Sequence, residues 1–167
     1  MLTKRQNLLE TIRGGHPDRY VNQYEAFNIQ RGTPFAMHNA NPKYGEENVV
    51  NAWGVTKSWP IGTPGAFPVH TPDKIVIKDI ENWRDYLKVP QVVYPAEDWA
   101  PFIAEAEKVD RSEQFVTAFF APGVFEQCHY LTEIQNCLIA FYEYPDEMHE
   151  LIDCITQFEL DYAAELC

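Results

Sequence analysis

The chain has 167 residues, a formal net charge of −12 at pH 7, and 46% hydrophobic and 14% aromatic residues. This composition excludes a disordered chain, and the acidic excess argues against a nucleic-acid or anionic-membrane partner, since both require clustered Lys and Arg. No run approaches the about 20 apolar residues of a membrane span, and the start does not resemble a secretion signal. We therefore expect a cytoplasmic protein whose four separate cysteines are reduced.

The first part of the chain predicts one helix followed by a long irregular segment. Thr3 and Gln6 form a capping box, and a Gly-Gly pair ends the helix that they begin. An extended stretch follows from Tyr20 to Phe27. Residues 28–71 are rich in Pro, Gly and Asn, with aromatic residues at no regular period. A segment of this length and composition favours a binding loop or a lid.

The rest of the chain predicts helices around short apolar strands. The run from Phe115 to Phe120 lacks polar alternation, which is typical of a strand buried on both faces in a parallel sheet. This pattern predicts an α/β fold that opens as a β/α array. The other expected elements are a strand at Ile75 to Ile77, a short helix at Trp83 to Leu87, and helices from about Ala96, from about Thr132 to Tyr144 and from Pro145 onward.

The helix predicted from Pro145 to Cys167 has apolar residues at three-and-four spacing, so one of its faces must be buried. No capping residue follows it. We therefore expect the N-terminal part of a longer enzyme, in which the partner of this helix comes later in the chain. An exposed stripe and unpaired strand edges promote association, so the isolated chain is expected to self-associate or to be only partly folded.

The stretch after the run from Phe115 to Phe120 is the best candidate for chemistry, because residues just past a strand line the active-site mouth of β/α barrels. Glu126 and His129 are three residues apart, and on a helix they would face one pocket as acid–base groups, with Tyr130 beside them. The alternative is a Glu that caps a backbone amide and a His packed among aromatic residues. Cys128 lies beside His129, but no second pair supports it at zinc spacing, so we predict no metal site in this chain.

The irregular segment supplies candidate substrate-binding residues. Trp53, Trp59, Phe67 and His70 lie among glycines and prolines, and aromatic walls suit a planar or apolar ligand. The alternative interpretation is that Trp53 and Trp59 anchor a long loop onto the core.

Four stretches occur in order along nearly the whole chain: Leu2–Arg5 to Gly14 with His16–Arg19, Trp53–Val55 with Pro64–Pro68, Lys78–Ile80 with Trp83–Tyr86, and Phe125-Glu126 through Tyr130-Leu131 to Pro145-Asp146. Together they resemble the N-terminal half of the uroporphyrinogen decarboxylase superfamily, which includes the decarboxylase and the cobalamin-linked methyltransferases. The resemblance implies one (β/α)8 TIM barrel of about twice this length.

The chain departs from the decarboxylase itself. Those enzymes carry an early Arg-Gln-Ala-Gly-Arg-Tyr stretch whose arginines help hold a porphyrinogen with many carboxylates. The comparable stretch here, Arg19 to Phe27, has one arginine and a glutamate, which is unsuited to a polyanion. The Trp-Gly-Val and Pro-Gly-Ala-Phe-Pro stretches instead resemble the O-demethylase components of the methyltransferase branch.

This resemblance implies methyl transfer between a small methylated substrate or tetrahydrofolate and the cobalt of a separate corrinoid protein. It also implies a zinc held by the later half of the barrel, with none in this chain. In the intact enzyme, Trp53, Trp59 and Phe67 would be ligand walls, and Glu126, His129 and Tyr130 polar groups at the barrel mouth. Two alternatives stay open: uroporphyrinogen III decarboxylase of porphyrin biosynthesis, and a non-catalytic half-barrel that pairs with another chain.

Overall fold

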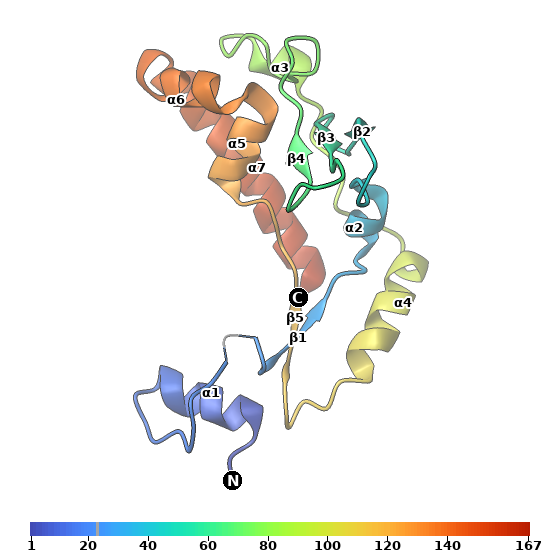
Figure 1. Cartoon of the computed structure of the whole chain (residues 1–167), viewed down its shortest axis with the longest axis vertical. Helices are drawn as coiled ribbons and strands as arrows, with labels where there is room; N and C mark the ends of the chain where they lie inside the picture. The colour runs from blue at the N-terminus through green and yellow to red at the C-terminus, as the bar shows by residue number, and fades with distance from the viewer. Residues whose placement is uncertain (23) are drawn as a thin grey trace. The chain divides into compact units, whose positions relative to one another are not determined.

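The computed structural model describes residues 1–22 and 24–167 (Figure 1). The chain is 43% helical and 9% strand, a mixed composition compatible with the α/β class. It divides into two compact units, each made of two separate stretches of chain. The N-terminal unit comprises Met1–Pro34 and Tyr94–Phe120, and the helical unit comprises Phe35–Val93 and Ala121–Cys167. The prediction of a single barrel domain over residues 1–167 stays a prediction.

The N-terminal unit begins with helix α1 (Lys4–Ile12), and the predicted capping box is confirmed. The Thr3 hydroxyl accepts a hydrogen bond from the Gln6 N–H (3.1 Å), and the Gln6 side chain accepts one from the Thr3 N–H (3.0 Å). Asn7, in the first turn of α1, is fully buried, and its side-chain oxygen accepts a hydrogen bond from the Asp18 N–H (2.9 Å). Local capping chemistry therefore sets the first element.

Strands β1 (Phe27–Gln30) and β5 (Phe115–Ala118) form a parallel pair in the N-terminal unit (Figure 1). Their register runs from Phe27 opposite Phe115 to Gln30 opposite Ala118. Helix α4 (Ala96–Glu107), which was predicted from about Ala96, contacts β1. Parallel strands require a crossover connection, and α4 lies in the chain between these two strands.

The expectation of a strand buried on both faces over Phe115 to Phe120 is wrong in extent and in burial. The strand ends at Ala118, its residues are only half-buried, and Phe119 and Phe120 remain 49% and 41% exposed. The reason is that β5 pairs only with β1 among the described residues, so no larger sheet encloses it.

The helical unit contains a small antiparallel sheet within the region that was expected to be irregular. Strands β2 (Val49–Val50), β3 (Thr56–Ser58) and β4 (Phe67–Pro68) pair in that order, after the short helix α2 (Pro34–His38). The expectation of a loop without secondary structure over residues 28–71 is therefore wrong. Strands of two or three residues are too short to show the alternation by which a strand is recognised.

The apolar run Ile75 to Ile77 is not a strand, contrary to expectation: its backbone is irregular, with a bend at Val76. Ile77 is 3% exposed, and its N–H donates to the Leu131 carbonyl (2.9 Å) at the end of a helix. The Leu131 carbonyl thus accepts the hydrogen bond that a neighbouring strand would otherwise accept from the Ile77 N–H. The short helix α3 (Trp83–Tyr86) follows as expected.

Three consecutive helices complete the helical unit: α5 (Val124–Thr132), α6 (Ile134–Glu143) and α7 (Pro145–Leu166). Glu133 separates the first two, with a φ of 75°, and its carboxylate accepts hydrogen bonds from the first N–H groups of α6. Pro145 starts α7 at the position where a missing N–H costs nothing. The predicted helices from about Thr132 and from Pro145 are confirmed.

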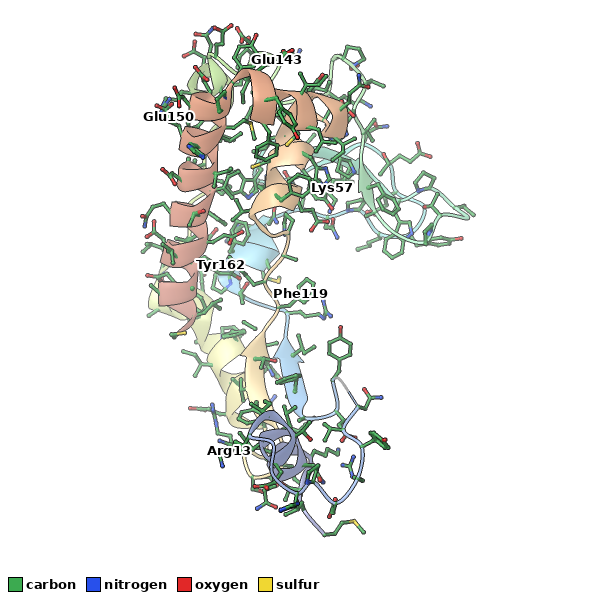
Figure 2. All side chains as sticks on the ribbon, turned by 90° about the vertical axis from the view of Figure 1, so that its left-hand side faces the viewer. Arg13, Lys57, Phe119, Glu143, Glu150 and Tyr162 are labelled. Atoms are coloured by element: carbon green, nitrogen blue, oxygen red, sulfur yellow. The ribbon has the colours of Figure 1, made fainter. Side chains whose placement is uncertain are left out.

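The apolar stripe of α7 forms the centre of the core. Phe158 packs against the ring of Trp53 (centroids 4.7 Å apart) and that of Phe35 (5.2 Å), and α7 also contacts α5 and α6. The expectation that this stripe lacks a partner in the chain is wrong, since its partners lie within the same unit. The buried residues of α7 are Met148, Leu151, Ile155, Phe158 and Tyr162, the last of which is labelled in Figure 2. Among the described residues, none of the helices is both long and apolar enough to cross a membrane.

Candidate functional site

Glu126 and Tyr130 lie one turn apart on α5 and form a direct hydrogen bond. The Tyr130 hydroxyl donates to Glu126 Oε1 at 2.8 Å. This four-residue spacing places both side chains on one face of the helix. The Glu126 carboxylate therefore accepts from a phenol rather than capping a backbone amide, which was the alternative reading of this residue.

Two residues from the small sheet join this pair. The ammonium of Lys57 on β3, a residue labelled in Figure 2, lies over the Tyr130 ring, 5.6 Å from its centroid. His70, which follows β4, has its Nε2 atom 3.2 Å from the Tyr130 carbonyl oxygen. Because Lys57 is paired opposite Pro68 in the sheet, the β3–β4 pairing brings both residues to α5. We call Lys57, His70, Glu126 and Tyr130 the Tyr130 cluster.

Burial shifts two pKa values of the cluster in opposite directions. The pKa of Tyr130 is raised to about 12, first by burial and then by its hydrogen bond to the Glu126 carboxylate and the charge of that group. Burial lowers the pKa of Lys57, and the negative charge of Glu126 opposes that shift. Burial penalises the charged form of each group, which is the phenolate for Tyr130 and the ammonium for Lys57. At neutral pH, Tyr130 is thus a protonated donor beside an amine that loses its proton more readily than an exposed lysine.

His129 takes a different position from the one expected of a catalytic group. Its ring packs against Tyr130 (centroids 4.9 Å) and Phe125 (5.5 Å), and Phe125 in turn lies beside Phe141 (6.2 Å). Its Nδ1 atom is buried, without a hydrogen-bond partner among the described residues. This placement favours the alternative of a histidine packed among aromatic residues.

The three aromatic residues proposed as ligand walls are not gathered into one pocket. Trp53 is 4% exposed and packs in the core against Phe158, which favours the anchoring interpretation. Trp59 stabilises its own loop, since its Nε1–H donates a hydrogen bond to the Thr63 carbonyl (3.2 Å). Phe67 remains 55% exposed on β4. Of the candidates from the irregular segment, the structure brings only His70 to Tyr130.

Lys57 is the member of the cluster that the sequence did not predict. It stands between buried Thr56 and Ser58 on a three-residue strand, and no motif surrounds it. Its contact with Tyr130 joins two elements that are distant in the sequence. No sequence pattern predicts the contact between Lys57 and Tyr130, which forms only when the chain folds.

The thiols and acidic groups do not form a metal site in the described part of the chain. No group of three or more His, Cys, Asp or Glu side chains there is arranged to hold a metal ion. Cys128 and Cys137 are buried in helices, and burial raises the pKa of both thiols, that of Cys128 to about 12. Such thiols remain protonated at neutral pH, whereas zinc takes thiolates. The absence of a metal site in this chain stays a prediction, since the resemblance implies zinc ligands from the later half of the barrel.

A separate pocket of about 240 Å³ opens in the helical unit beside α6. Its lining combines isoleucines with a few polar side chains and does not include the Tyr130 cluster. The lining residues are Ile77, Lys78, Asp79, Ile80, Thr132, Asn136, Ile139, Ala140 and Tyr144.

Comparison of the chain with protein-family models, with curated proteins and with solved structures finds no match.

Proposed function

We propose that the chain is the N-terminal half of a (β/α)8 barrel of the uroporphyrinogen decarboxylase superfamily, and that the intact protein is a cytoplasmic corrinoid-linked methyltransferase. The order of the four resembling stretches supports this proposal. The parallel pair of β1 and β5, with α4 between them in the chain, is the type of unit from which such barrels are built.

The observation that carries the proposal is the Tyr130 cluster on the helix that follows β5. In β/α barrels, chemistry is performed by residues that come just after the strands. Here that segment supplies a hydrogen-bonded Glu126–Tyr130 pair, to which the small sheet adds Lys57 and His70. These groups are suited to holding and orienting a polar group of a small methylated substrate.

The pairing of Arg19 favours the methyltransferase over the decarboxylase. Arg19 is the only arginine of the stretch from Arg19 to Phe27, and it forms an ion pair with Glu25 of the same stretch. A guanidinium paired in this way has its charge balanced within the protein, which reduces its value for a polycarboxylate substrate.

The proposed reaction moves a methyl group from a small methylated compound, or between tetrahydrofolate and corrinoid, with the cobalt on a partner protein. A bound zinc would supply Lewis acidity, and its ligands would come from the later half of the barrel. Self-association stays a prediction, which the open edges of the β1–β5 pair support.

The test measures methyl transfer and decarboxylation side by side on the intact protein. Corrinoid protein in its reduced form is supplied with methylated small molecules, and methylation of cobalt is followed by its absorption spectrum, while uroporphyrinogen III is offered in a parallel assay. We expect methylcorrinoid and no coproporphyrinogen. The Glu126→Gln variant should slow methyl transfer, whereas Glu143→Gln, an exposed change on α6, should not.

Each other outcome selects one of the alternatives. Robust formation of coproporphyrinogen without methyl transfer would replace the proposal with the decarboxylase. Copurification with a second chain and neither activity would favour the non-catalytic half-barrel. Mass spectrometry of the native protein separates this last case, because a full barrel would be about twice as heavy as 19.3 kDa.

A further inference from the structure

The pocket of about 240 Å³ beside α6, which we call the α6 pocket, is lined from two sides within the helical unit. On one side, α6 supplies lining residues that are three and four positions apart and therefore share one helical face. These residues are Asn136, Ile139 and Ala140. On the other side lies the segment of residues 77–80. The hydrogen bond from the Ile77 N–H to the Leu131 carbonyl (2.9 Å) holds this segment against the end of α5.

The apolar part of the lining consists of four side chains. Ile77 and Ala140 are buried, whereas Ile80 is half-buried and Ile139 is 42% exposed. Apolar surface that faces solvent in a concave site favours a ligand with an apolar body, because that body removes the surface from water. Pockets for drug-sized ligands measure about 300–1,000 Å³, so the α6 pocket suits a smaller molecule of roughly ten non-hydrogen atoms.

The polar part of the lining leaves two hydrogen-bond donors available. Among the described residues, the Lys78 ammonium forms no ion pair or hydrogen bond, and the Tyr144 hydroxyl forms no hydrogen bond. The Asp79 carboxylate, by contrast, is engaged within its own turn. Its Oδ1 accepts from the Glu81 N–H (3.1 Å) and its Oδ2 from the Asn82 side chain (2.8 Å). The available cation and phenol both donate hydrogen bonds.

The other two polar side chains of the lining already donate to the backbone. The Thr132 hydroxyl donates to the Cys128 carbonyl (2.9 Å), and Asn136 Nδ2 donates to the Thr132 carbonyl (3.1 Å). The α6 pocket therefore offers one cation and one hydroxyl beside a wall of isoleucines. That combination matches a ligand with one anionic end and one apolar end.

We propose that the α6 pocket binds a small monocarboxylate with an apolar body. Its carboxylate accepts hydrogen bonds from the Lys78 ammonium and the Tyr144 hydroxyl, and its hydrocarbon part lies against the isoleucines. A multiply charged anion is disfavoured, because Lys78 is the single cation of the lining and the charge of Asp79 lies in the same pocket. This site is independent of the proposed methyl transfer, since its lining does not include the Tyr130 cluster.

The structural alternative is a water-filled surface hollow whose exposed Lys78 extends into solvent. The two readings differ in how the pocket treats a carboxylate and its neutral analogue. A hollow that only collects apolar molecules would bind both equally, whereas the proposed site gains charge-assisted hydrogen bonds with the carboxylate alone.

The experiment titrates the purified protein with phenylacetate and, separately, with phenylacetamide, and follows binding by saturation-transfer NMR of the ligand. We expect saturable binding of phenylacetate, at least about tenfold tighter than that of the amide, because charge-assisted hydrogen bonds are the stronger ones. Lys78→Met should weaken phenylacetate binding by about tenfold for the same reason. Lys88→Met is the matched control and should leave binding unchanged, because Lys88 is an exposed lysine of the same unit outside the lining.

A second pair of variants tests the apolar wall. Ile139 and Leu138 are neighbours on α6 and are 42% and 50% exposed, but only Ile139 lines the pocket. Ile139→Glu places a negative charge beside the carboxylate and should abolish binding of phenylacetate, whereas Leu138→Glu should not. Because both side chains are exposed, neither change removes a buried contact from the core.

Three results would overturn the proposal. The first is the lack of saturable phenylacetate binding up to about 10 mM, and the second is equal affinity for the acid and the amide. The third is a pair of variants, at either position, whose two members bind equally. If a variant loses its helical circular dichroism, the comparison of acid and amide in the unaltered protein decides alone. Since no corrinoid is present, failure here leaves the methyl-transfer proposal standing, and failure of methyl transfer leaves this one standing.

Discussion

The two units of this protein bury their residues very differently. The helical unit has a contiguous apolar core in which Leu131, Leu151 and Ile155 are at most 1% exposed. In the N-terminal unit, strands β1 and β5 are only half-buried, and fully buried Asn7 is a polar side chain. The helical unit is therefore stabilised mainly by the burial of apolar surface, whereas hydrogen bonds carry a larger share in the N-terminal unit.

This difference bears on the proposed site, because the Tyr130 cluster lies wholly within the helical unit. A site whose supporting side chains are locked by packing keeps its geometry better than one on a loosely packed element. We therefore expect local opening of the chain to begin in the N-terminal unit and to leave the cluster intact.

The largest expected effect tests the core of the helical unit. Leu151→Ala removes a fully buried side chain from α7 and should lower the free energy of unfolding by about 2–5 kcal/mol. Phe115→Ala, on half-buried β5, is the comparison and should cost about 1–2 kcal/mol. Denaturant unfolding followed by circular dichroism measures both. Equal losses would show that the two units are packed to the same degree.

The next effect tests the polar anchor of the N-terminal unit. Asn7→Ala removes the acceptor of the Asp18 N–H and the donor to the Leu2 carbonyl (3.3 Å), at a fully buried position. Leaving those backbone groups unpaired should cost about 1–3 kcal/mol. Hydrogen exchange should show lost protection in α1 and unchanged protection in α7. Loss in both helices would mean that the units do not open separately.

A smaller, pH-dependent effect concerns the start of α6. Hydrogen bonds from the Gln135 and Asn136 N–H groups hold the pKa of Glu133 below its ordinary value of 4.5. The ionised carboxylate therefore stabilises the fold above that value, and this contribution is lost as the pH falls through the lowered pKa. Glu133→Gln should cost about 1 kcal/mol at pH 7.

The measurement is thermal unfolding of Glu133→Gln and the unaltered protein at several pH values. The difference between them should shrink as the pH falls below 4.5, because Glu133 becomes protonated in the unaltered protein. A difference that is constant with pH would show that the Glu133 charge contributes nothing to the cap.

The smallest effect concerns the Tyr130 cluster itself. Glu126→Gln replaces the charged acceptor of the Tyr130 hydroxyl by a neutral amide, so the pKa of Tyr130 should fall from about 12 toward its ordinary value of 10. Ultraviolet titration of Glu126→Gln, with Tyr130→Phe subtracted as the blank, isolates this phenol from the other tyrosines. An unchanged Tyr130 titration would mean that burial alone raises this pKa.

Elements specified by neighbouring residues were predictable from the sequence. The capping box of α1, the beginning of α4 and the Pro-initiated stripe of α7 each depend on contacts within a few residues. Strands were less predictable, because an apolar run becomes a strand only if another strand pairs with it. Ile75 to Ile77 found no such strand, and its Ile77 N–H is satisfied by the end of α5.

The candidate site divides in the same way. Glu126 and Tyr130 are four residues apart, so helix geometry alone determines that they meet once α5 forms. Two further outcomes depend on how the small sheet and its loops pack against the helices. Lys57 and His70 contact Tyr130, and Trp53 packs in the core beside Phe158. Those contacts join distant parts of the chain, and only tertiary packing could decide them, because no local interaction distinguishes a tryptophan that lines a site from one that anchors a loop.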